Sequence, residues 1–291
     1  MKTHLFRLEC LTDLHVGNGE ANYSIIDNEV QKDTVLADVP IIHASGVKGA
    51  LKEHFEQLWK NEDGSRENDV ADRILNIFGG IKKTKDKGIK EKNVTVEGSY
   101  KFFTAFCIAR PLRVSSGSRP YILTAGMDAL KSFSTFLEGL GLSQYYKYQE
   151  IPFDTVFAYS TQGNEELEIE GEAATKIENI GAIVTAPLQR LIGQEFAVAK
   201  TLRDYALPVR ARNVLSENGI SENLWYEELV PHKSIFYFAV ITPGETCDLP
   251  FDVNGTPVPV QFGGNASIGN GYTMIKDMTK DAKVPEVRQN G

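Results

Sequence analysis

Hydrophobic and polar positions near the start of the chain predict a strand followed by a long polar segment. Residues Leu5 to Leu11 alternate enough to predict a first β-strand. Thr12 to His43 is rich in Gly, Asp, Asn and Glu. Because a loop of that length directly after a strand is uncommon without a role of its own, we expect this segment to be functional.

Helical spacing begins after the polar segment. Ser45 fits an N-cap, and a helix is predicted through about Lys60. Its buried stripe is predicted at Val47, Leu51, Phe55 and Leu58. A second helical piece, Arg73 to Phe78, is predicted to end at the glycine pair 79–80.

The central part of the chain predicts two strands and a further helix. The strands are Phe102 to Ala109 and Leu112 to Val114, and the helix ends at Gly139 and Gly141. Its buried stripe is Met127, Leu130, Phe133 and Leu137. The order strand, helix, strand, strand, helix predicts an α+β fold built on a modified ferredoxin-like (RRM-like) unit with insertions.

The second half of the chain has a weaker pattern. Helical segments are predicted around Ile180 to Ile192 and Ala197 to Tyr205, and residues 167–170 are predicted as one side of a small protruding hairpin. Further strands are predicted at Leu207 to Val214, Ile235 to Ile241 and Val258 to Phe262.

These elements are interpreted as one domain spanning residues 1–291. The insertions are a polar loop at 12–44, a polar loop at 82–99 and an insertion at 145–175, and the tail 279–291 is expected to fray.

Composition limits the classes of function. The chain has 31 Lys and Arg against 39 Asp and Glu, a net charge of −8, whereas a free-standing non-specific nucleic-acid binder is usually basic. Any RNA site must therefore be a local patch. Residues 82–92 hold six lysines, and a solvated loop is the likelier interpretation of that run.

Targeting and redox signals point to a cytoplasmic protein. The three cysteines are far apart and lack the C-x-x-C spacing of a zinc site or a disulfide framework. The first ten residues interrupt their apolar positions with charges, and there is no long apolar run, so neither a signal peptide nor a membrane span is expected.

A glycine-rich run follows the last predicted strand. Gln261 to Tyr272 contains Gly263, Gly264, Gly269 and Gly271. Glycines allow positive φ and close approach of another backbone, so the run could hold an anion through outward N–H groups. It lacks the Walker and dinucleotide signatures, and a glycine-rich hairpin without a ligand is an equal alternative.

Lys48 is unusual because a cation so near a helix start opposes the helix dipole. With Gly46 and Gly49 beside it, the position predicts an anion site, although a surface lysine is the alternative. Asp27 follows two apolar residues that could aim its carboxylate, which could hold a hydrated Mg²⁺ or help to deprotonate a ribose 2′-OH. A turn-forming or solvated Asp27 is the more common case, and His15 is more often structural than catalytic.

Other residues are less specific. G-x-S-x-G and H-E-x-x-H are absent, which disfavours hydrolase, protease and zinc classes. Several arginines lie in or beside predicted strands, where they could pair either with phosphates or with carboxylates. They are Arg110, Arg113, Arg119, Arg210 and Arg212.

Several of these segments, in this order, resemble the RAMP-superfamily backbone subunit of type III-B CRISPR-Cas (Cmr) complexes. The matching pieces run from residue 11 to 271. They are residues 11–19, Asp27 with 30–32, 39–42 with 45–52, 78–79, 111–115, Leu224-Trp-Tyr-Glu-Glu228 and the glycine run.

The resemblance implies a subunit that stacks head to tail on a CRISPR guide RNA, with a protruding thumb that displaces a base at regular intervals. Complementary target RNA would be cut at those positions, with a divalent cation, expected to be Mg²⁺. Asp27 matches the cleaving carboxylate and a candidate metal ligand, and Lys48 matches the guide-binding lysine. The other expected RNA-binding residues are His15, Ser45, Gly46, Arg113, Gly263, Gly264, Gly269 and Gly271.

Three segments depart from the family pattern: 43–44, 123–126 and 232–234. Asp27 and Lys48 are kept, so their implied roles stand. Expected partners are copies of the same chain and other type III-B subunits, with no membrane. A purely structural filament subunit and a histidine-dependent CRISPR RNA processing nuclease, using His15 or His43, are the alternatives.

Overall fold

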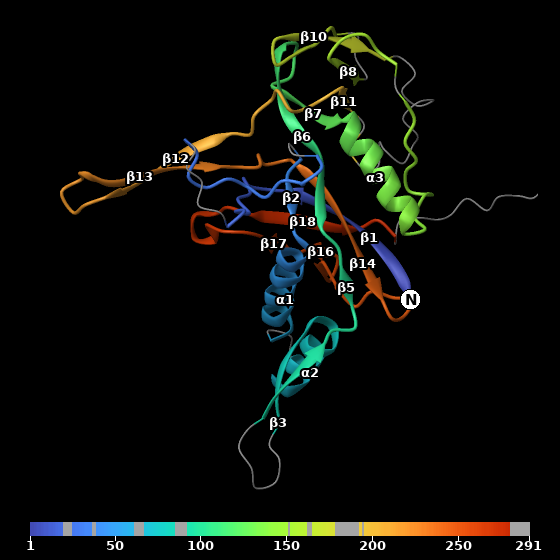
Figure 1. Cartoon of the computed structure of the whole chain (residues 1–291), viewed down its shortest axis with the longest axis vertical. Helices are drawn as coiled ribbons and strands as arrows, with labels where there is room; N and C mark the ends of the chain where they lie inside the picture. Colours follow the sequence, from blue (N-terminus) through green and yellow to red (C-terminus); the bar gives the residue numbers. More distant parts are fainter. Residues whose placement is uncertain are drawn as a thin grey trace, which may run out of the picture.

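The computed structural model describes residues 1–19, 25–36, 39–60, 67–84, 92–150, 152–161, 165–177, 192–193 and 195–279. Its fold is mixed α+β with a β-rich core (Figure 1). The helices are α1 (Ala44–Lys60), α2 (Glu67–Phe78), α3 (Met127–Gly139) and the 3-10 turn η1 (Ala266–Ile268).

A large sheet forms the centre of the molecule, with strand order β17-β18-β1-β14-β6-β7-β11-β8-β10-β9. The first half of that path comprises β17 (Val260–Gln261), β18 (Tyr272–Asp277), β1 (Lys2–Cys10), β14 (Ile235–Thr242), β6 (Ala105–Ser116) and β7 (Tyr121–Gly126). The second half comprises β11 (Phe196–Ala199), β8 (Phe157–Ser160), β10 (Glu172–Lys176) and β9 (Glu168–Ile169). Short strands β2 (Ile41–Ile42) and β5 (Lys101–Phe102) pair with β6 and β14.

Strand β14 lies at the middle of the core. Its residues 235–240 are fully buried because β1 pairs with one edge of the strand, β5 and β6 pair with the other, and helices cover the faces. A continuous apolar run is typical of a strand buried on both faces.

Helices α1 and α3 lie on opposite faces of this sheet. The ring of Tyr237 packs against that of Phe133 of α3, with centroids 5.0 Å apart. The neighbouring Phe238 stacks on Phe6, and Phe251 connects Phe6 to Phe55 of α1. Successive strand residues face opposite sides. The α+β class is confirmed. The ferredoxin-like arrangement expected from the sequence has its helices on one face of the sheet, and it is therefore not confirmed.

Outside the main sheet, β15 (Asp252–Val253) pairs with β16 (Thr256–Pro257). Two further small hairpins also lie outside it. Strands β3 (Gly79–Thr84) and β4 (Lys92–Glu97) pair where the sequence predicted a polar loop at 82–99, so that prediction was wrong for the described part. Strands β12 (Val209–Leu215) and β13 (Ser221–Glu228) form a hairpin that extends away from the body (Figure 1).

The projecting hairpin is not the one predicted within 145–175. Residues 168–176 do form a hairpin, β9 and β10, but β9 pairs with β6 and β10 with β8. Leu167 and Ile169 are buried, so this hairpin packs on the body instead of protruding. Burial of alternate apolar side chains holds it against the sheet.

Other sequence predictions differ in detail. The helix predicted at 197–205 is wrong, because Phe196–Ala199 is strand β11. This buried apolar run is too short for a strand period to be distinguished from a helical one. The two strands predicted between residues 102 and 114 are mainly a single strand, β6. In α1, Trp59 is buried where Leu58 was expected, since it lies four residues after Phe55 on the same face.

Some predictions fall outside the described residues: the helix at 180–191 and most of the tail after Thr279. The division into one domain with insertions stays a prediction. Among the described residues, no helix has the length and apolar character needed to span a bilayer.

Gly98 joins the end of α2 to β4 through a close backbone contact. A Cβ at Gly98 would lie 2.5 Å from Ile77 O and 2.5 Å from the Phe78 carbonyl carbon. We expect Gly98→Ala to destabilise the chain by about 1–3 kcal/mol, since backbone atoms must move to admit the methyl group. Chemical denaturation measures this, with Gly244→Ala as control because nothing lies within 4 Å of that Cβ position. Equal denaturation midpoints for the two variants would contradict the prediction.

Candidate RNA-cleavage site at the root of the projecting hairpin

The loop after β1 crosses the root of the projecting hairpin. Leu14 N–H donates to Val230 O, and Val230 N–H donates back to Leu14 O, both at 2.8 Å. His15 Nδ1 lies 2.8 Å from Glu228 O. Because a carbonyl oxygen can only accept, Nδ1 carries the proton. His15 is buried, so it is positioned as a structural histidine holding the loop on β13.

Asp27 is fixed on the same strand by reciprocal hydrogen bonds. Its N–H donates to Tyr226 O at 3.1 Å, and Tyr226 N–H donates to Asp27 Oδ2 at 2.8 Å. Asn28 continues the pairing, since Glu228 N–H donates to Asn28 O at 2.9 Å. Asp27 is nevertheless exposed. Its carboxylate is thus held by backbone groups while remaining open to solvent, which is what a carboxylate acting on a large substrate requires.

Glu227 connects the hairpin root to the glycine-rich run. One oxygen, Oε2, accepts from Arg212 Nε at 2.6 Å and from Asn265 Nδ2 at 3.1 Å, while Oε1 accepts from Trp225 Nε1 at 2.9 Å. Burial alone would raise the pKa of Glu227, but the hydrogen bonds from Trp225 and Arg212 outweigh it and hold that pKa below its ordinary value.

Sequence reasoning did not identify Glu227 as a site residue. The sequence places it only within the Leu224 to Glu228 segment, and it leaves Arg212 open between a phosphate and a carboxylate partner. The one signal available is an acidic residue next to the aromatic pair Trp225 and Tyr226. Its partners, Arg212 and Asn265, are 15 and 38 residues away in sequence, so only the fold pairs them.

The glycine-rich run packs on the loop that carries His15. A Cβ at Gly263 would lie 2.1 Å from His15 O, and one at Gly271 would lie 1.9 Å from Phe262 O. Both have positive φ, +74° and +81°. Glycine is therefore required at both positions, because protein backbone approaches each of them closely.

The N–H groups of this run are mostly used within the protein. Gly264 donates to His15 O, Gly269 to Ala266 O and Gly271 to Asp13 O, at 2.8–3.0 Å. Of the two equal alternatives for the run, these three N–H groups do not favour the anion cradle, because loop carbonyls accept from Gly264 and Gly271, and Ala266 O within the run accepts from Gly269. Whether RNA lies against the run stays a prediction.

The start of α1 is tied to the same loop through Gln31. Gln31 Nε2 donates to Gly17 O at 3.0 Å, and Gln31 Oε1 accepts from His43 N–H at 2.9 Å. His43 O accepts from Val47 N–H, so α1 begins at Ala44 and Ser45 lies inside the first turn. The prediction of Ser45 as N-cap was wrong by this shift.

Lys48 consequently lies farther into α1 than expected. It is exposed, and with Ser45 it lines a groove against β3 and β4. Gly46 faces Ile42, whose Cγ2 would lie 3.3 Å from a Cβ at that position. The structure therefore joins His15, Asp27 and the glycine run at one root, and Gln31 connects the start of α1, with Ser45, Gly46 and Lys48, to it.

The arginines have protein partners. Arg212 pairs with Glu227, Arg210 with Asp13 at 2.6 Å, and Arg119 with Glu165 and Glu195. Arg110 donates to main-chain carbonyls of 202–206. Arg113 is exposed and lies 3.9 Å from Glu170, at the corner where β6 meets β9, so the structure does not bring it to the Asp27 root.

Metal ligands do not gather at Asp27. In the part of the chain that the structure describes, no group of three His, Cys, Asp or Glu side chains could hold a metal ion. The described side chains therefore do not form a complete site for a divalent cation. Mg²⁺ generally keeps several waters and uses one or two carboxylates together with substrate phosphates.

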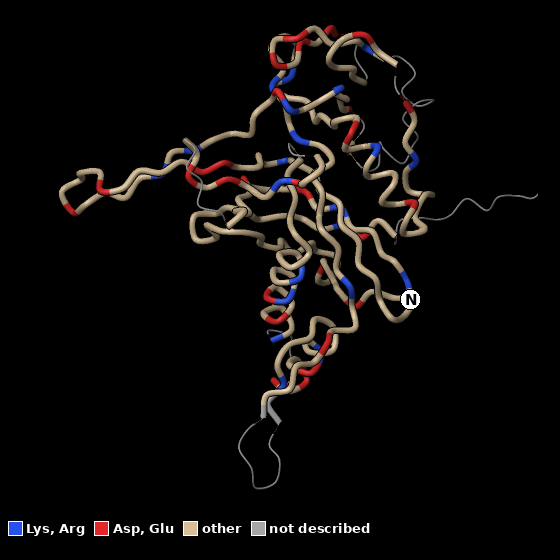
Figure 2. The backbone as a smooth tube through the Cα atoms, in the orientation of Figure 1, with Lys and Arg blue, Asp and Glu red and all other residues tan. Residues whose placement is uncertain are grey.

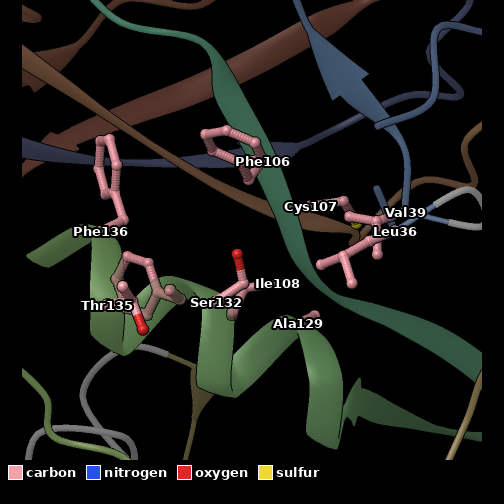
Figure 3. A pocket seen from close by; sticks show the side chains of 10 residues that line it. Leu36, Val39, Phe106, Cys107, Ile108, Ala129, Ser132, Thr135 and Phe136 are labelled. Carbon is pink, nitrogen blue, oxygen red and sulfur yellow. The ribbon is translucent and has the colours of Figure 1, made fainter. Parts of the chain in front are cut away.

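An apolar pocket of about 260 Å³ lies elsewhere, between α3 and β6 (Figure 3). It contains none of the predicted site residues. Burial raises the pKa of its Cys107 thiol to about 12, so that thiol is protonated and not a nucleophile. Its lining is Leu36, Val39, Phe106, Cys107, Ile108, Ala129, Ser132, Phe133, Thr135 and Phe136.

Known proteins resemble the chain over nearly its whole length. It is 24% identical to the CRISPR system Cmr endoribonuclease Cmr4 of Pyrococcus furiosus over 97% of this chain and 98% of that protein. A chain of a type III-B Cmr-beta complex bound to cognate target RNA has a TM-score of 0.69 and 18% identity, covering 97% of this chain and 99% of that one.

Oligomeric Cmr4 from Pyrococcus furiosus has a similar fold, with a TM-score of 0.62 and 18% identity over 95% of this chain and 98% of that one. The sequence profile of the RAMP superfamily matches residues 7–253. This range includes Asp27, α1 and the projecting hairpin, and the glycine-rich run lies after it. The chain is a member of the RAMP superfamily.

Proposed function

We propose that the chain is the Cmr4-like backbone subunit of a type III-B CRISPR effector complex, which binds guide RNA and cuts complementary target RNA. Asp27 carries this proposal, because an exposed carboxylate is held rigidly at the root of a projecting hairpin. The full-length similarity to the endoribonuclease Cmr4 supports it. Proposed partners are copies of this chain and other subunits of the complex, in the cytoplasm.

We propose that the β12–β13 hairpin, and not residues 145–175, is the thumb that separates guide and target at regular intervals. Its outer part exposes apolar side chains that have no cover in the described protein, among them Leu215, Ile220 and Leu224, which are 59%, 66% and 53% exposed. Aliphatic side chains of this kind can insert as wedges between bases and unstack them. The strand order β18-β1-β14-β6 supports the proposal that the palm beneath is a modified ferredoxin-like sheet.

The chemistry assigned to Asp27 is general-base activation of the ribose 2′-OH next to the scissile phosphate. Tyr226 N–H donates to Oδ2 and so orients the carboxylate toward its exposed side. A divalent cation, Mg²⁺, is proposed as well. Because the described residues form no complete site, it would have to share Asp27 with RNA oxygens and water.

Two alternatives remain distinct from this proposal. In a purely structural subunit, Asp27 would only pair with Tyr226. A processing nuclease would use a histidine, but His15 is buried, which disfavours it as a base for a large substrate.

Asp27→Asn should abolish the regularly spaced cuts in complementary RNA, lowering the cleavage rate by about 100-fold or more. Asparagine keeps an oxygen for the Tyr226 N–H, so the loop should retain its conformation, and only the charge is lost. The measurement is cleavage by the assembled complex with Mg²⁺, with guide binding followed in parallel.

Asp252→Asn, on an exposed strand, is the matched control and should cut normally. Unchanged cutting by Asp27→Asn would favour the structural alternative. Cutting that persists in EDTA would remove the cation from the proposal while leaving Asp27 in place.

Lys48→Ala should weaken guide RNA binding. An exposed lysine that contacts one phosphate releases about one counterion from the RNA, and this release makes binding depend on the salt concentration. The slope of log K against log salt should become shallower by about 0.7. Binding of labelled guide at several salt concentrations gives this slope. Lys131→Ala on α3 is the control; identical slopes for wild type and Lys48→Ala would count against the role.

Glu227→Gln should destabilise the chain by about 1.5–3 kcal/mol at neutral pH, because an amide replaces a carboxylate that faces Arg212 and Asn265. The folded-state pKa of Glu227 is depressed, so its contribution is present above the unfolded pKa, about 4.3, and is lost as the pH falls through the folded value. Unfolding measured from pH 7 to pH 3 should show the wild type and the variant converging. A pH-independent difference would show that the carboxylate charge is not what stabilises the root.

A further inference from the structure

Glu228, the last residue of β13, is a buried carboxylate to which the proposed cleavage step gives no role. The adjacent Glu227 faces the other side of the strand, because successive strand residues point in opposite directions. Glu227 contacts Arg212 and Asn265, whereas Glu228 contacts the Asp27 segment, residues 27–32. Figure 2 shows acidic and basic segments meeting where the projecting hairpin joins the body. The two neighbouring carboxylates therefore bind different parts of the root.

The Glu228 carboxylate accepts two hydrogen bonds from the Asp27 segment. Val30 N–H donates to Oε2 at 3.2 Å, and Lys32 Nζ donates to Oε1 at 2.9 Å. Val30 is buried, and the side chain of Lys32 is 31% exposed against 6% for that of Glu228. A buried carboxylate needs a compensating charge as well as hydrogen bonds, and the Lys32 ammonium supplies that charge.

The main chain of Glu228 binds the root as well. Its N–H donates to Asn28 O at 2.9 Å, and its O lies 2.8 Å from His15 Nδ1. Asp27 N–H donates in turn to Tyr226 O. Main-chain groups of β13 therefore hold the start of the Asp27 segment, and the Glu228 carboxylate holds its end. Two attachments a few residues apart fix the direction of the segment as well as its position.

The orientation of Asp27 depends on this backbone. Asp27 is exposed, so close packing does not hold its carboxylate. A displacement of about 1 Å between reacting groups can lower a rate by about 100-fold. A general base on an exposed segment therefore requires that the segment itself be held.

We propose that Glu228 and Lys32 form a positioning pair, which fixes the backbone of the Asp27 segment so that the Asp27 carboxylate meets the ribose 2′-OH. Neither member of the pair has to contact RNA for this role. The role rests on the proposed function, because Asp27 is the group that is positioned. A direct contact between the partly exposed Lys32 and an RNA phosphate is the competing role.

The first test is the single-turnover rate of target cleavage by the assembled complex at saturating target RNA. Lys32→Met should lower this rate about tenfold or more, with an unchanged KM, because the charge is lost while the length of the side chain is kept. Lys32→Arg should restore most of the rate, since a cation stays within reach of Glu228. Lys2→Met is the matched control: it breaks an exposed pair with Glu245 and should cut normally.

A double-mutant cycle tests whether the two residues act as one unit. Glu228→Gln keeps an oxygen for Val30 N–H but removes the charge that Lys32 neutralises, so its rate should also fall. The double variant Lys32→Met with Glu228→Gln should cut no more slowly than the slower single variant. Losses that multiply would show that the residues act independently, and would contradict the pair.

Hydrogen exchange of the free full-length chain measures the positioning without RNA. The amides of residues 28–32 should exchange about fivefold faster or more in Lys32→Met and in Glu228→Gln, because the end of the segment is released. The amides of β14 should exchange as they do in the wild type. Unchanged exchange at 28–32 would overturn the proposal. Faster exchange in β14 as well would overturn it too, because the pair would then stabilise the whole fold.

Salt dependence separates the pair from an RNA contact. In Lys32→Met, the slope of log K against log salt for target RNA binding should equal that of the wild type. A slope shallower by about 0.7 would assign Lys32 to a phosphate and exclude the positioning role. The proposed function fails separately, if Asp27→Asn cuts normally. Normal exchange at 28–32 in Lys32→Met sinks the positioning pair even where Asp27→Asn has lost cleavage.

Discussion

The backbone pairing at the root of β13 is the constraint on which the candidate site depends. Three segments from different parts of the sequence bond to Tyr226, Glu227 and Glu228: the His15 loop, the Asp27 segment and, through Asn265, the glycine-rich run. Each of these three contacts uses a side chain, and main-chain pairing of Asp27 and Asn28 with Tyr226 and Glu228 supports them, so the arrangement depends on particular side chains as well as on the backbone. It places a carboxylate at the base of the projecting β12–β13 hairpin.

Most charged side chains at this root are paired within the protein. Arg210 and Arg212 neutralise Asp13 and Glu227, and Lys32 pairs with Glu228 at 2.9 Å. The Arg212–Glu227 pair is buried, and a buried pair adds little net stability, but removing one partner leaves an uncompensated charge. These cations are therefore held by carboxylates of the chain itself.

The glycines have two separate physical origins. At Gly263, Gly271, Gly79 and Gly98, protein backbone occupies the place of a side chain, so their role is internal packing. At Gly49 that place is empty. The same residue type thus marks a tight joint in one place and an open surface in another, and composition alone does not separate the two.

The sequence by itself determined the α+β class, strand β1, helices α1 and α3 and the buried run of β14, because these depend on local periodicity and burial of apolar residues. The resemblance to the RAMP family also identified Asp27 and Lys48 as the residues to follow. Only the tertiary structure decided which hairpin projects, that Phe196–Ala199 is a strand, and that Glu227 joins Arg212 and Asn265. These features depend on hydrogen bonds between residues distant in sequence, and a local pattern contains no information about which partners will meet.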